Sequence, residues 1–324
     1  MPIVVNSNAS ATAASFNLSK ANDALRQSLE RLSSGKRINN AGDDAGGLSV
    51  AYKLNSRINR TNALIQNSQN ALSYLQVQDS ALSTVGNIVD RMAELRTMAQ
   101  DITKNSGDIE NYTKEFVELQ SQLNQISNEK FNGISLFGKT SSSSVDGVLN
   151  KGTASFLGGD SVSKNYTTFS RTHTTHTSGD SALGSISINV INFQFMLSIG
   201  QLRSNTSAQA DLGNIDGSNT GNGVNASGFI DSILEVSVSQ FLDIIERVAD
   251  MRAENGAEQN RVMNSIGLLQ SNVVNMEAAH GRIMDTDVAA ESTRFARHNI
   301  LMQASASMTA QANQLSSVAL ALIG

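Results

Sequence analysis

Cysteine and tryptophan are both absent from the 324-residue sequence, and its only proline is Pro2. Without cysteine the chain has no disulfide, no thiolate metal ligand and no thiol nucleophile. Because proline breaks the interior of a helix, its absence after residue 2 permits very long helices. Aromatic residues make up only 5% of the chain. The gaps between elements must therefore be filled by Ala, Leu, Ile and Val, which suits closely packed helices.

The sequence also lacks a basic surplus and a long apolar run. Its formal charge is −5 and its pI is near 5.4, which argues against nucleic acid as the main partner because phosphate binding needs a basic field. No stretch approaches the ~18–20 apolar residues of a membrane span. The first basic residue is Lys20, and no apolar run of signal length precedes it. We therefore expect no membrane span and, if the protein is secreted, export without a cleaved signal peptide.

Apolar positions recur in alternating steps of three and four along both ends of the chain, a spacing typical of coiled coils. The pattern predicts a helix from about Asp44 to Thr103, ~90 Å long at 1.5 Å per residue, with Asp43 and Asp44 as N-cap candidates. A helix of this length needs a partner, which the C-terminal part supplies. The clearest runs are Leu54, Ile58, Ile65, Leu72 and Leu75; Val85, Ile88, Met92, Leu95 and Ile102; Phe116, Leu119, Leu123 and Ile126; Ile230, Leu234, Phe241, Ile245 and Val248; and Ile266, Leu269, Val273, Met276 and Ile283.

The middle of the chain has a different composition. Residues 138–228 are rich in Gly, Ser, Thr and Asn, and the alternation from Ile186 to Ile191 predicts a strand that continues to Leu197. The fold we expect is mainly α. A long antiparallel coiled-coil or helical-bundle rod is formed by paired N- and C-terminal segments, and a small β-rich variable domain is inserted.

We divide the chain into five segments. Residues 1–43 and 285–324 form the two halves of an inner coiled-coil domain, 44–137 and 229–284 form the two parts of a helical rod domain, and 138–228 form a variable outer domain. The two extreme segments have thin apolar stripes filled out by Ala, Ser, Asn and Gln. Alone they bury too little apolar area to offset the entropy of ordering. We expect them to be disordered in a monomer and ordered when packed against copies of themselves.

Several motifs occur in a fixed order along the two ends. They are Leu32-Ser-Ser-Gly-Lys-Arg-Ile-Asn-Asn-Ala-Gly-Asp-Asp-Ala-Gly-Gly-Leu48, Phe131-Asn-Gly133, Gly256-Ala-Glu-Gln-Asn-Arg261, Arg282-Ile-Met-Asp-Thr-Asp287, Ile300-Leu-Met-Gln-Ala304 and Ala310-Gln-Ala-Asn-Gln314. Together they resemble the signatures of the bacterial flagellin family. The last ten residues lack the proline and the final arginine that many flagellins carry, although their apolar pattern survives.

The resemblance implies a structural subunit that polymerises with itself into the flagellar filament for motility. It also implies an inner coiled-coil tube, a rod layer around it and an outward-facing variable domain. Its expected partners are the flagellar type III export apparatus, an export chaperone, the filament cap and the hook-junction proteins. The expected location is the extracellular filament.

Two groups of residues are candidates for assembly contacts. The inner contacts are assigned to apolar residues of the two ends; the alternative is that these are ordinary intramolecular core positions. The loop from Lys36 to Asp44 is a candidate hinge and interface through Gly35, Arg37, Asp43 and Asp44, with Gly42, Gly46 and Gly47 allowing a bend; the alternative is a plain solvated linker. The inner-contact candidates are Leu18, Leu25, Leu32, Leu301, Met308, Leu315, Val318 and Leu322.

Three residues match family positions that contact the animal Toll-like receptor for flagellin. Arg91 and Leu95 lie in an R-x-x-E-L context, and Glu118 aligns after a three-residue insertion. Arg91 and Leu95 are four apart and share one helical face. The alternative is that Leu95 belongs to the core of the rod and Arg91 is a solvated charge.

Enzyme interpretations find little support in the residues. The four histidines, His173, His176, His280 and His298, do not form an H-E-x-x-H zinc motif, and neither a G-x-S-x-G elbow nor a P-loop occurs. We expect no catalytic site, cofactor or metal. Two alternatives to a filament subunit stay open: a hook–filament junction protein, and an enzyme or adhesin displayed on a flagellin scaffold through residues 138–228.

Overall fold

The computed structural model describes most of the chain in two compact units. The terminal unit comprises Met1–Arg60 and Ser271–Gly324, and the central unit comprises Thr61–Gln270. The described residues are 8–138, 150–157, 163–180, 182, 184–197, 230 and 232–323, and for 150–157, 163–167, 194 and 315–323 the backbone alone is described.

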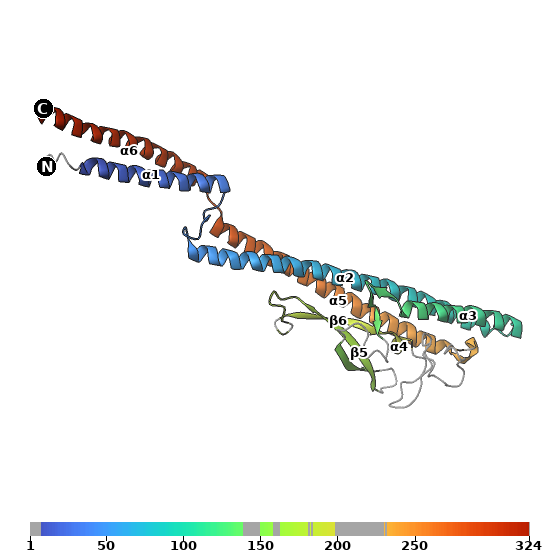
Figure 1. The fold of residues 1–324 in the computed structure, drawn as a ribbon. Coiled ribbons are helices and arrows are strands. Elements are labelled where there is room, and N and C mark those ends of the chain that lie inside the picture. Colours follow the sequence, from blue (N-terminus) through green and yellow to red (C-terminus); the bar gives the residue numbers. More distant parts are fainter. Residues whose placement is uncertain are drawn as a thin grey trace. The chain divides into compact units, whose positions relative to one another are not determined.

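Long helices dominate the described residues, as the apolar spacing predicts (Figure 1). The helix predicted from Asp44 to Thr103 is present, although it ends four residues early. Ile102 lies beyond that end and is 97% exposed, so its place in the predicted apolar run was wrong. The helices are α1 (Ala9–Ser34), α2 (Ala45–Ala99), α3 (Ser106–Ser127), α4 (Phe193–Met196), α5 (Val238–Met284) and α6 (Val288–Ile323), with a 3₁₀ turn at Ile233–Glu235.

The break between α2 and α3 is set by a capping box. The Asn105 side chain accepts the backbone N–H of Asp108, and the Asp108 carboxylate accepts that of Asn105. This reciprocal pair satisfies two donors that the first turn of a helix leaves open. The chain therefore starts a new helix at Ser106 instead of extending α2.

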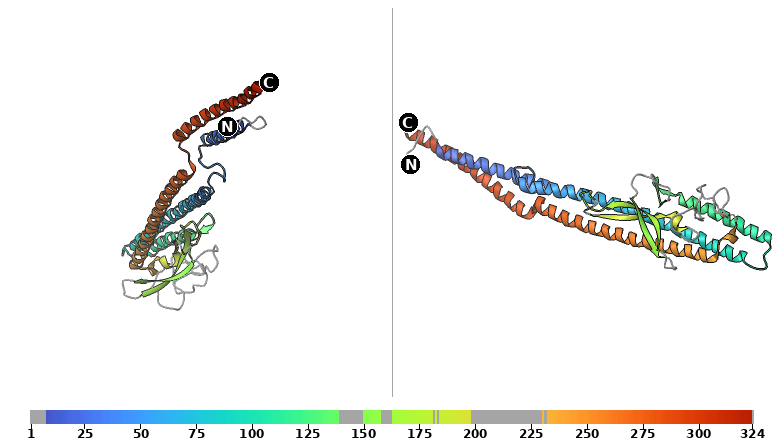
Figure 2. Two further views of the ribbon diagram at one scale, coloured as in Figure 1. Left: turned by 90° about the vertical axis from the view of Figure 1, so that its left-hand side faces the viewer. Right: turned by 90° about the horizontal axis from the view of Figure 1, so that it is seen from below.

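In the terminal unit, α1 and α6 lie side by side (Figures 1 and 2). At one end the Asn8 Nδ2 atom donates to the carbonyl of Ala312 at 2.8 Å. At the other end the Thr286 N–H donates to the carbonyl of Gly35 at 3.0 Å. The two helices therefore run antiparallel, which confirms the predicted pairing of the two ends of the chain.

The described residues of the central unit form two small sheets. The strands are β1 (Lys130–Phe131) and β2 (Ile134–Ser135) in one, and β3 (Phe137–Gly138), β4 (Asn150–Leu157), β5 (Ser163–Thr174) and β6 (Ser185–Asn192) in the other, in the order β3-β6-β5-β4. β6 runs parallel to β3 and antiparallel to β5. Asn132 and Gly133 between β1 and β2 both have positive φ, 50° and 79°. That is the requirement of a tight type I′ hairpin turn.

The strand predicted to continue to Leu197 stops at Asn192. The Asn192 side chain accepts the backbone N–H of Phe195 and caps the short helix α4. Phe193, Met196 and Leu197 then pack in the core of the central unit. The prediction was wrong at this point because a short apolar run can be buried either as a strand or as a helix. Here the Asn192 cap favours the helix.

The core of the central unit packs side chains of α2, α3 and α5 against the sheet. Phe116 of α3 and Phe241 of α5 are fully buried and meet edge to face, with their ring centroids 6.2 Å apart. Val85, Met92 and Leu95 of α2 are fully buried beside them. Leu234, assigned to an apolar stripe in the sequence, is instead 46% exposed in the 3₁₀ turn.

Candidate assembly surfaces and paired connectors

Two short connectors of the terminal unit run beside each other. The first (residues 35–44) joins α1 to α2, and the second (residues 285–287) joins α5 to α6. Lys36 and Asp285 form an antiparallel β-bridge. The Arg37 N–H donates to the carbonyl of Met284 at 2.6 Å, and the Thr286 N–H donates to that of Gly35 at 3.0 Å. We refer to these two segments as the paired connectors.

The Arg37 side chain adds to the same contact. Its Nε and Nη2 atoms donate to the carbonyl of Ile283 at 3.1 and 2.9 Å. A guanidinium fork thereby satisfies a carbonyl that the C-terminal end of α5 leaves without a helical partner. Arg37, predicted as part of a hinge or interface loop, thus ties the first connector to the C-terminal end of α5 within one chain.

A small apolar cluster lies next to the connectors. Ile38 is 2% exposed and packs with Ala51 of α2 and Met284 of α5, while Leu48 and Ile283 are partly buried against them. Ile38 is the one large apolar residue of the connector. Its burial anchors the connector at this point, while most of the other connector residues are exposed.

Asp43 and Asp44 were both predicted as N-caps, and they have different roles. The Asp44 Oδ1 atom accepts the N–H of Gly47 at 2.8 Å and caps α2. The Asp43 Oδ2 atom accepts the N–H groups of Asn39 and Asn40, each at 3.1 Å, and so folds the connector upon itself. These backbone N–H donors, with further help from Gln27, hold the pKa of Asp43 below its usual value.

The predicted bend depends on one glycine more than on the others. Gly35 follows the last turn of α1 in the left-handed region at φ 69°, and its N–H donates to the carbonyl of Arg31. Such a conformation is the common way for a helix to end. Gly46 and Gly47 do not contribute to the bend, contrary to the prediction, because they lie inside α2.

The helices α1 and α6 expose large apolar side chains. Within the described part of α1 the one buried side chain is that of Ser28. Among the predicted contact residues, Leu18, Leu25 and Leu32 are partly buried, whereas Leu301 and Met308 are 48% and 63% exposed. Leu315, Val318 and Leu322 lie in the last part of α6, for which the backbone alone is described. Further exposed side chains that the sequence analysis missed are Phe16 (70%), Leu29 (55%), Val288 (58%) and Ile300 (66%).

The predicted receptor residues lie in the central unit. The Arg91 Nε atom is 2.8 Å from Glu115 Oε1, and its Nη1 atom is 3.0 Å from Glu94 Oε2. Glu118 is exposed on α3, whereas Leu95 is fully buried. The Leu95 side chain therefore forms part of the core of this unit. The receptor contact stays a prediction, and Arg91 and Glu118 are the members with accessible side chains.

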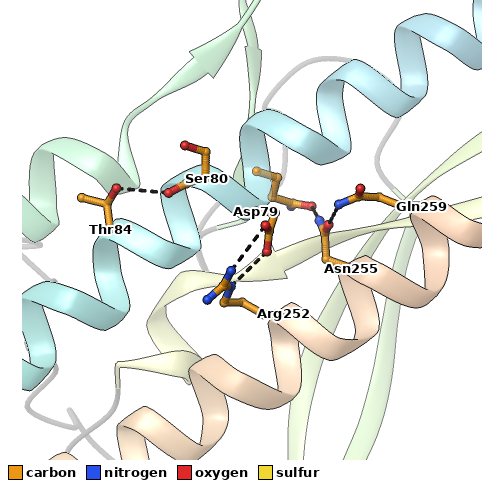
Figure 3. A network of polar contacts seen from close by, with 7 residues as sticks. Asp79, Ser80, Thr84, Arg252, Asn255 and Gln259 are labelled. Atoms are coloured by element: carbon orange, nitrogen blue, oxygen red, sulfur yellow. Dashed lines mark hydrogen bonds and ion pairs between the residues drawn. The ribbon is translucent and has the colours of Figure 1, made fainter.

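A buried polar network joins α2 and α5 in the central unit (Figure 3). Asn255 Nδ2 donates to Gln78 Oε1 at 2.7 Å, and Gln259 Nε2 donates to Asn255 Oδ1 at 2.6 Å. Beside it, Arg252 of α5 forms an ion pair with Asp79 of α2 at 3.0 Å. These contacts fix the register of the two helices, because each polar group leaves its partner unsatisfied if one helix slides.

The candidate metal ligands are dispersed in the described residues. Within them no three His, Cys, Asp or Glu side chains gather as a metal site. His173 and His176, which are three residues apart in the sequence, form hydrogen bonds with different partners. His173 pairs with Ser68, and His176 pairs with Ser178. The same described residues contain no helix with the length and apolarity of a membrane span.

Comparison with known proteins identifies the family of the chain. The model of the bacterial flagellin N-terminal helical region matches residues 5–142, and that of the bacterial flagellin C-terminal helical region matches residues 241–323. The flagellin of Bacillus subtilis (strain 168) is 31% identical over 314 residues, which cover 96% of each chain. The chain belongs to the bacterial flagellin family.

Other flagellins match over the same extent. Polar flagellin F of Vibrio parahaemolyticus is 29% identical over 378 residues and is covered completely, as is this chain. Among solved structures, a protein of Vibrio parahaemolyticus assigned as flagellar hook-associated has a TM-score of 0.53 at 15% identity, over 75% of this chain and 100% of its own. That likeness concerns the fold alone. As a flagellin, this protein is a structural subunit that polymerises into the extracellular flagellar filament.

Proposed function

We propose that this flagellin polymerises through the outer surfaces of α1 and α6, with the paired connectors holding the two helices in register. The supporting observation is that, among the described side chains of α1 and α6, few are buried and six large apolar ones are exposed. If neighbouring copies cover these side chains, the apolar area that they bury favours assembly. These six are Phe16, Leu29, Val288, Ile300, Leu301 and Met308.

Assembly in this proposal is coupled to ordering of the ends. Alone, α1 and α6 bury too little apolar area to offset the conformational entropy of two helices. Neighbouring copies supply the missing area, and a contact between unlike surfaces that does not close into a ring extends into a filament. Ordering is then favoured only at the growing end, which limits polymerisation elsewhere.

The five-segment division gives the proposed layers of the filament. Residues 1–43 and 285–324 form the inner layer, 44–137 and 229–284 form the rod layer, and 138–228 face outward. We propose export through the flagellar type III apparatus with a chaperone and without a cleaved signal peptide. Folding then takes place beneath the filament cap, and the first subunits contact the hook-junction proteins.

Seeded assembly tests the proposal. Purified monomer is mixed with short filament seeds or a precipitating salt and viewed by electron microscopy, beside Leu301→Gln, Met308→Gln and a version lacking residues 285–324. Full-length protein is expected to form long filaments, the truncated version to stay monomeric, and the two substitutions to raise the critical concentration. The expected increase in the critical concentration is on the order of tenfold, if each substitution removes about 1.4 kcal/mol of free energy from buried apolar contacts.

The matched control is Ser307→Ala, which changes an exposed polar position next to Met308. It is expected to assemble like the unmodified protein, and the three substituted variants should keep the far-ultraviolet circular dichroism spectrum of the unmodified protein. If full-length protein stays monomeric under every seeding condition, a junction role becomes the better interpretation. If the two glutamine variants assemble normally, the contacts lie elsewhere on the chain.

A further inference from the structure

Sulfur chemistry in this chain belongs to methionine alone. The sequence has ten methionines and no cysteine. Hydrogen peroxide oxidises the methionine thioether to a sulfoxide, which turns a flexible apolar side chain into a polar one. This reaction requires that the oxidant reach the sulfur atom. The exposure of each methionine therefore decides which parts of the molecule an oxidant changes first.

The described methionine side chains differ widely in exposure. Met263 of α5 and Met308 of α6 are the two exposed ones, at 48% and 63%. Four others, at most 8% exposed, are Met92, Met196, Met251 and Met284. These four pack in the core of the central unit and in the small cluster beside the connectors. Mild oxidation is therefore expected to spare the packed regions and to act on Met263 and Met308.

Met308 differs from Met263 in its surroundings. It lies on α6 seven residues after Leu301, so the two side chains share one face of the helix. Both belong to the six exposed apolar side chains assigned above to contacts between copies. Met263 lies on α5 within the central unit and is outside that surface. One accessible sulfur thus lies on the proposed assembly surface, and the other serves as a matched reference.

We propose that Met308 is an oxidation site that controls elongation of the filament. The inference rests on the proposed function, because it requires that neighbouring copies cover α6. One oxygen atom passes from hydrogen peroxide to the Met308 Sδ atom. The peroxide O–O bond breaks and an S–O bond forms, so the thioether is oxidised to the sulfoxide and the peroxide is reduced to water.

The sulfoxide has different consequences before and after assembly. In the monomer its oxygen faces water, so the subunit keeps its fold. A neighbouring copy that covers Met308 removes this water, and burying a polar group without a hydrogen-bond partner is unfavourable. In a finished filament the same cover keeps the oxidant away from Met308. Oxidant therefore prevents the addition of free subunits while existing filaments persist, and a methionine sulfoxide reductase reverses the change.

Elongation from seeds after oxidation of the full-length monomer tests the proposal. The monomer is treated with hydrogen peroxide until peptide mass spectrometry detects the sulfoxide at Met308, and the peroxide is then removed. We expect the critical concentration to rise at least about tenfold, because assembly buries the new polar group. Incubation with a methionine sulfoxide reductase should reverse the rise. The circular dichroism spectrum of the oxidised monomer should match that of the untreated one.

Two conservative variants identify the sulfur that matters. Met308→Leu keeps an apolar side chain of similar size and should elongate normally after the same peroxide treatment. Met263→Leu is the matched control and should stay as sensitive to peroxide as the unmodified protein. A loss of elongation that persists in Met308→Leu after treatment places the sensitive sulfur elsewhere and overturns the proposal.

Oxidation of preassembled filaments separates this inference from the proposed function. Met308 should be oxidised at least about tenfold more slowly in filaments than in the monomer, because neighbouring copies bury its sulfur. If Met308 is protected in filaments but monomer carrying its sulfoxide elongates normally, the oxidation control is overturned and the assembly surface stands. If Met308 is oxidised equally fast in both forms, copies do not cover it, and the assembly surface fails at this residue together with the control.

Partly oxidised monomer supplies a test that needs no variant, should Met308→Leu fail to assemble before treatment. Filaments grown from this mixture are separated from the remaining monomer by sedimentation, and the Met308 sulfoxide content of each fraction is measured. The filament fraction should be depleted in the sulfoxide by at least about tenfold, since oxidised subunits add less favourably. Equal sulfoxide content in the two fractions overturns the proposal.

Discussion

The central and terminal units hold their helices together in different ways. The largest fully buried side chains in the described residues, such as Phe116, Phe241 and Met92, all lie in the central unit. The apolar cluster of the terminal unit is small and centres on Ile38 and Met284. Backbone hydrogen bonds at the paired connectors, Arg37 N–H to Met284 and Thr286 N–H to Gly35, also join the two ends of the chain. The central unit therefore has a core of its own, whereas the terminal unit leaves apolar surface for neighbouring copies.

The largest expected effect comes from emptying the core of the central unit. Phe116→Ala removes a fully buried ring that packs on Phe241, and should lower the free energy of unfolding by about 3–5 kcal/mol. Urea denaturation followed by circular dichroism measures the loss. A decrease below about 1 kcal/mol would mean that the surrounding side chains fill the cavity. The core of the central unit would then depend little on this ring.

In the terminal unit the largest effect is expected from the backbone and not from an apolar side chain. Gly35→Ala places a Cβ at φ 69° and should destabilise the connector by roughly 1–2 kcal/mol. Hydrogen exchange of the Arg37 and Thr286 amides, which bridge the connectors, reports this directly. Gly42→Ala is the control because Gly42 has no positive φ and its Cβ would meet nothing within 4 Å. Equal effects at the two glycines would contradict the assignment.

A smaller effect is expected at the cap of α2. Asp44→Ala removes the acceptor for the Gly47 N–H and should cost about 1 kcal/mol. Asp44→Asn should restore nearly all of it, since asparagine caps a helix about as well as aspartate. Exchange of the Gly47 and Leu48 amides is the measurement. If asparagine proves as harmful as alanine, charge at this position matters more than capping.

The smallest effect on the monomer is expected at the exposed ring of α1. Phe16→Ala should change the free energy of unfolding by less than about 0.5 kcal/mol, because the ring is 70% exposed and has few partners within the chain. Under the proposed function the same change should raise the critical concentration for filament assembly. If Phe16→Ala lowers the stability of the monomer and assembles normally, then the ring packs within its own chain and does not contact neighbouring copies.

Much of the helical fold could be predicted from the sequence, and the reasons are local. The spacing of Val85, Ile88 and Met92 defines one buried face, and these residues are buried in the structure. β5 escaped notice because it is rich in Thr and other polar residues and lacks an apolar alternation. The capping box at Asn105 has a readable N-x-x-D pattern, which could have placed the end of α2 before Ile102.

The candidate site was predictable only in part. Leu301 and Met308 are exposed on α6, where the apolar series placed them, but their contacts in a filament stay a prediction. The pairing of Lys36 with Asp285 joins residues far apart in the chain through backbone groups. Backbone hydrogen bonds leave almost no mark on residue choice. No spacing rule could therefore have found the paired connectors.

The paired connectors also restrict how the length of this chain can vary. A residue inserted between α1 and α2 would move Lys36 out of step with Asp285 and Arg37 out of step with Met284. A compensating insertion between α5 and α6 would be needed to restore the match. The two connectors should therefore tolerate insertions and deletions only in concert, even though more than two hundred residues separate them in the gene product.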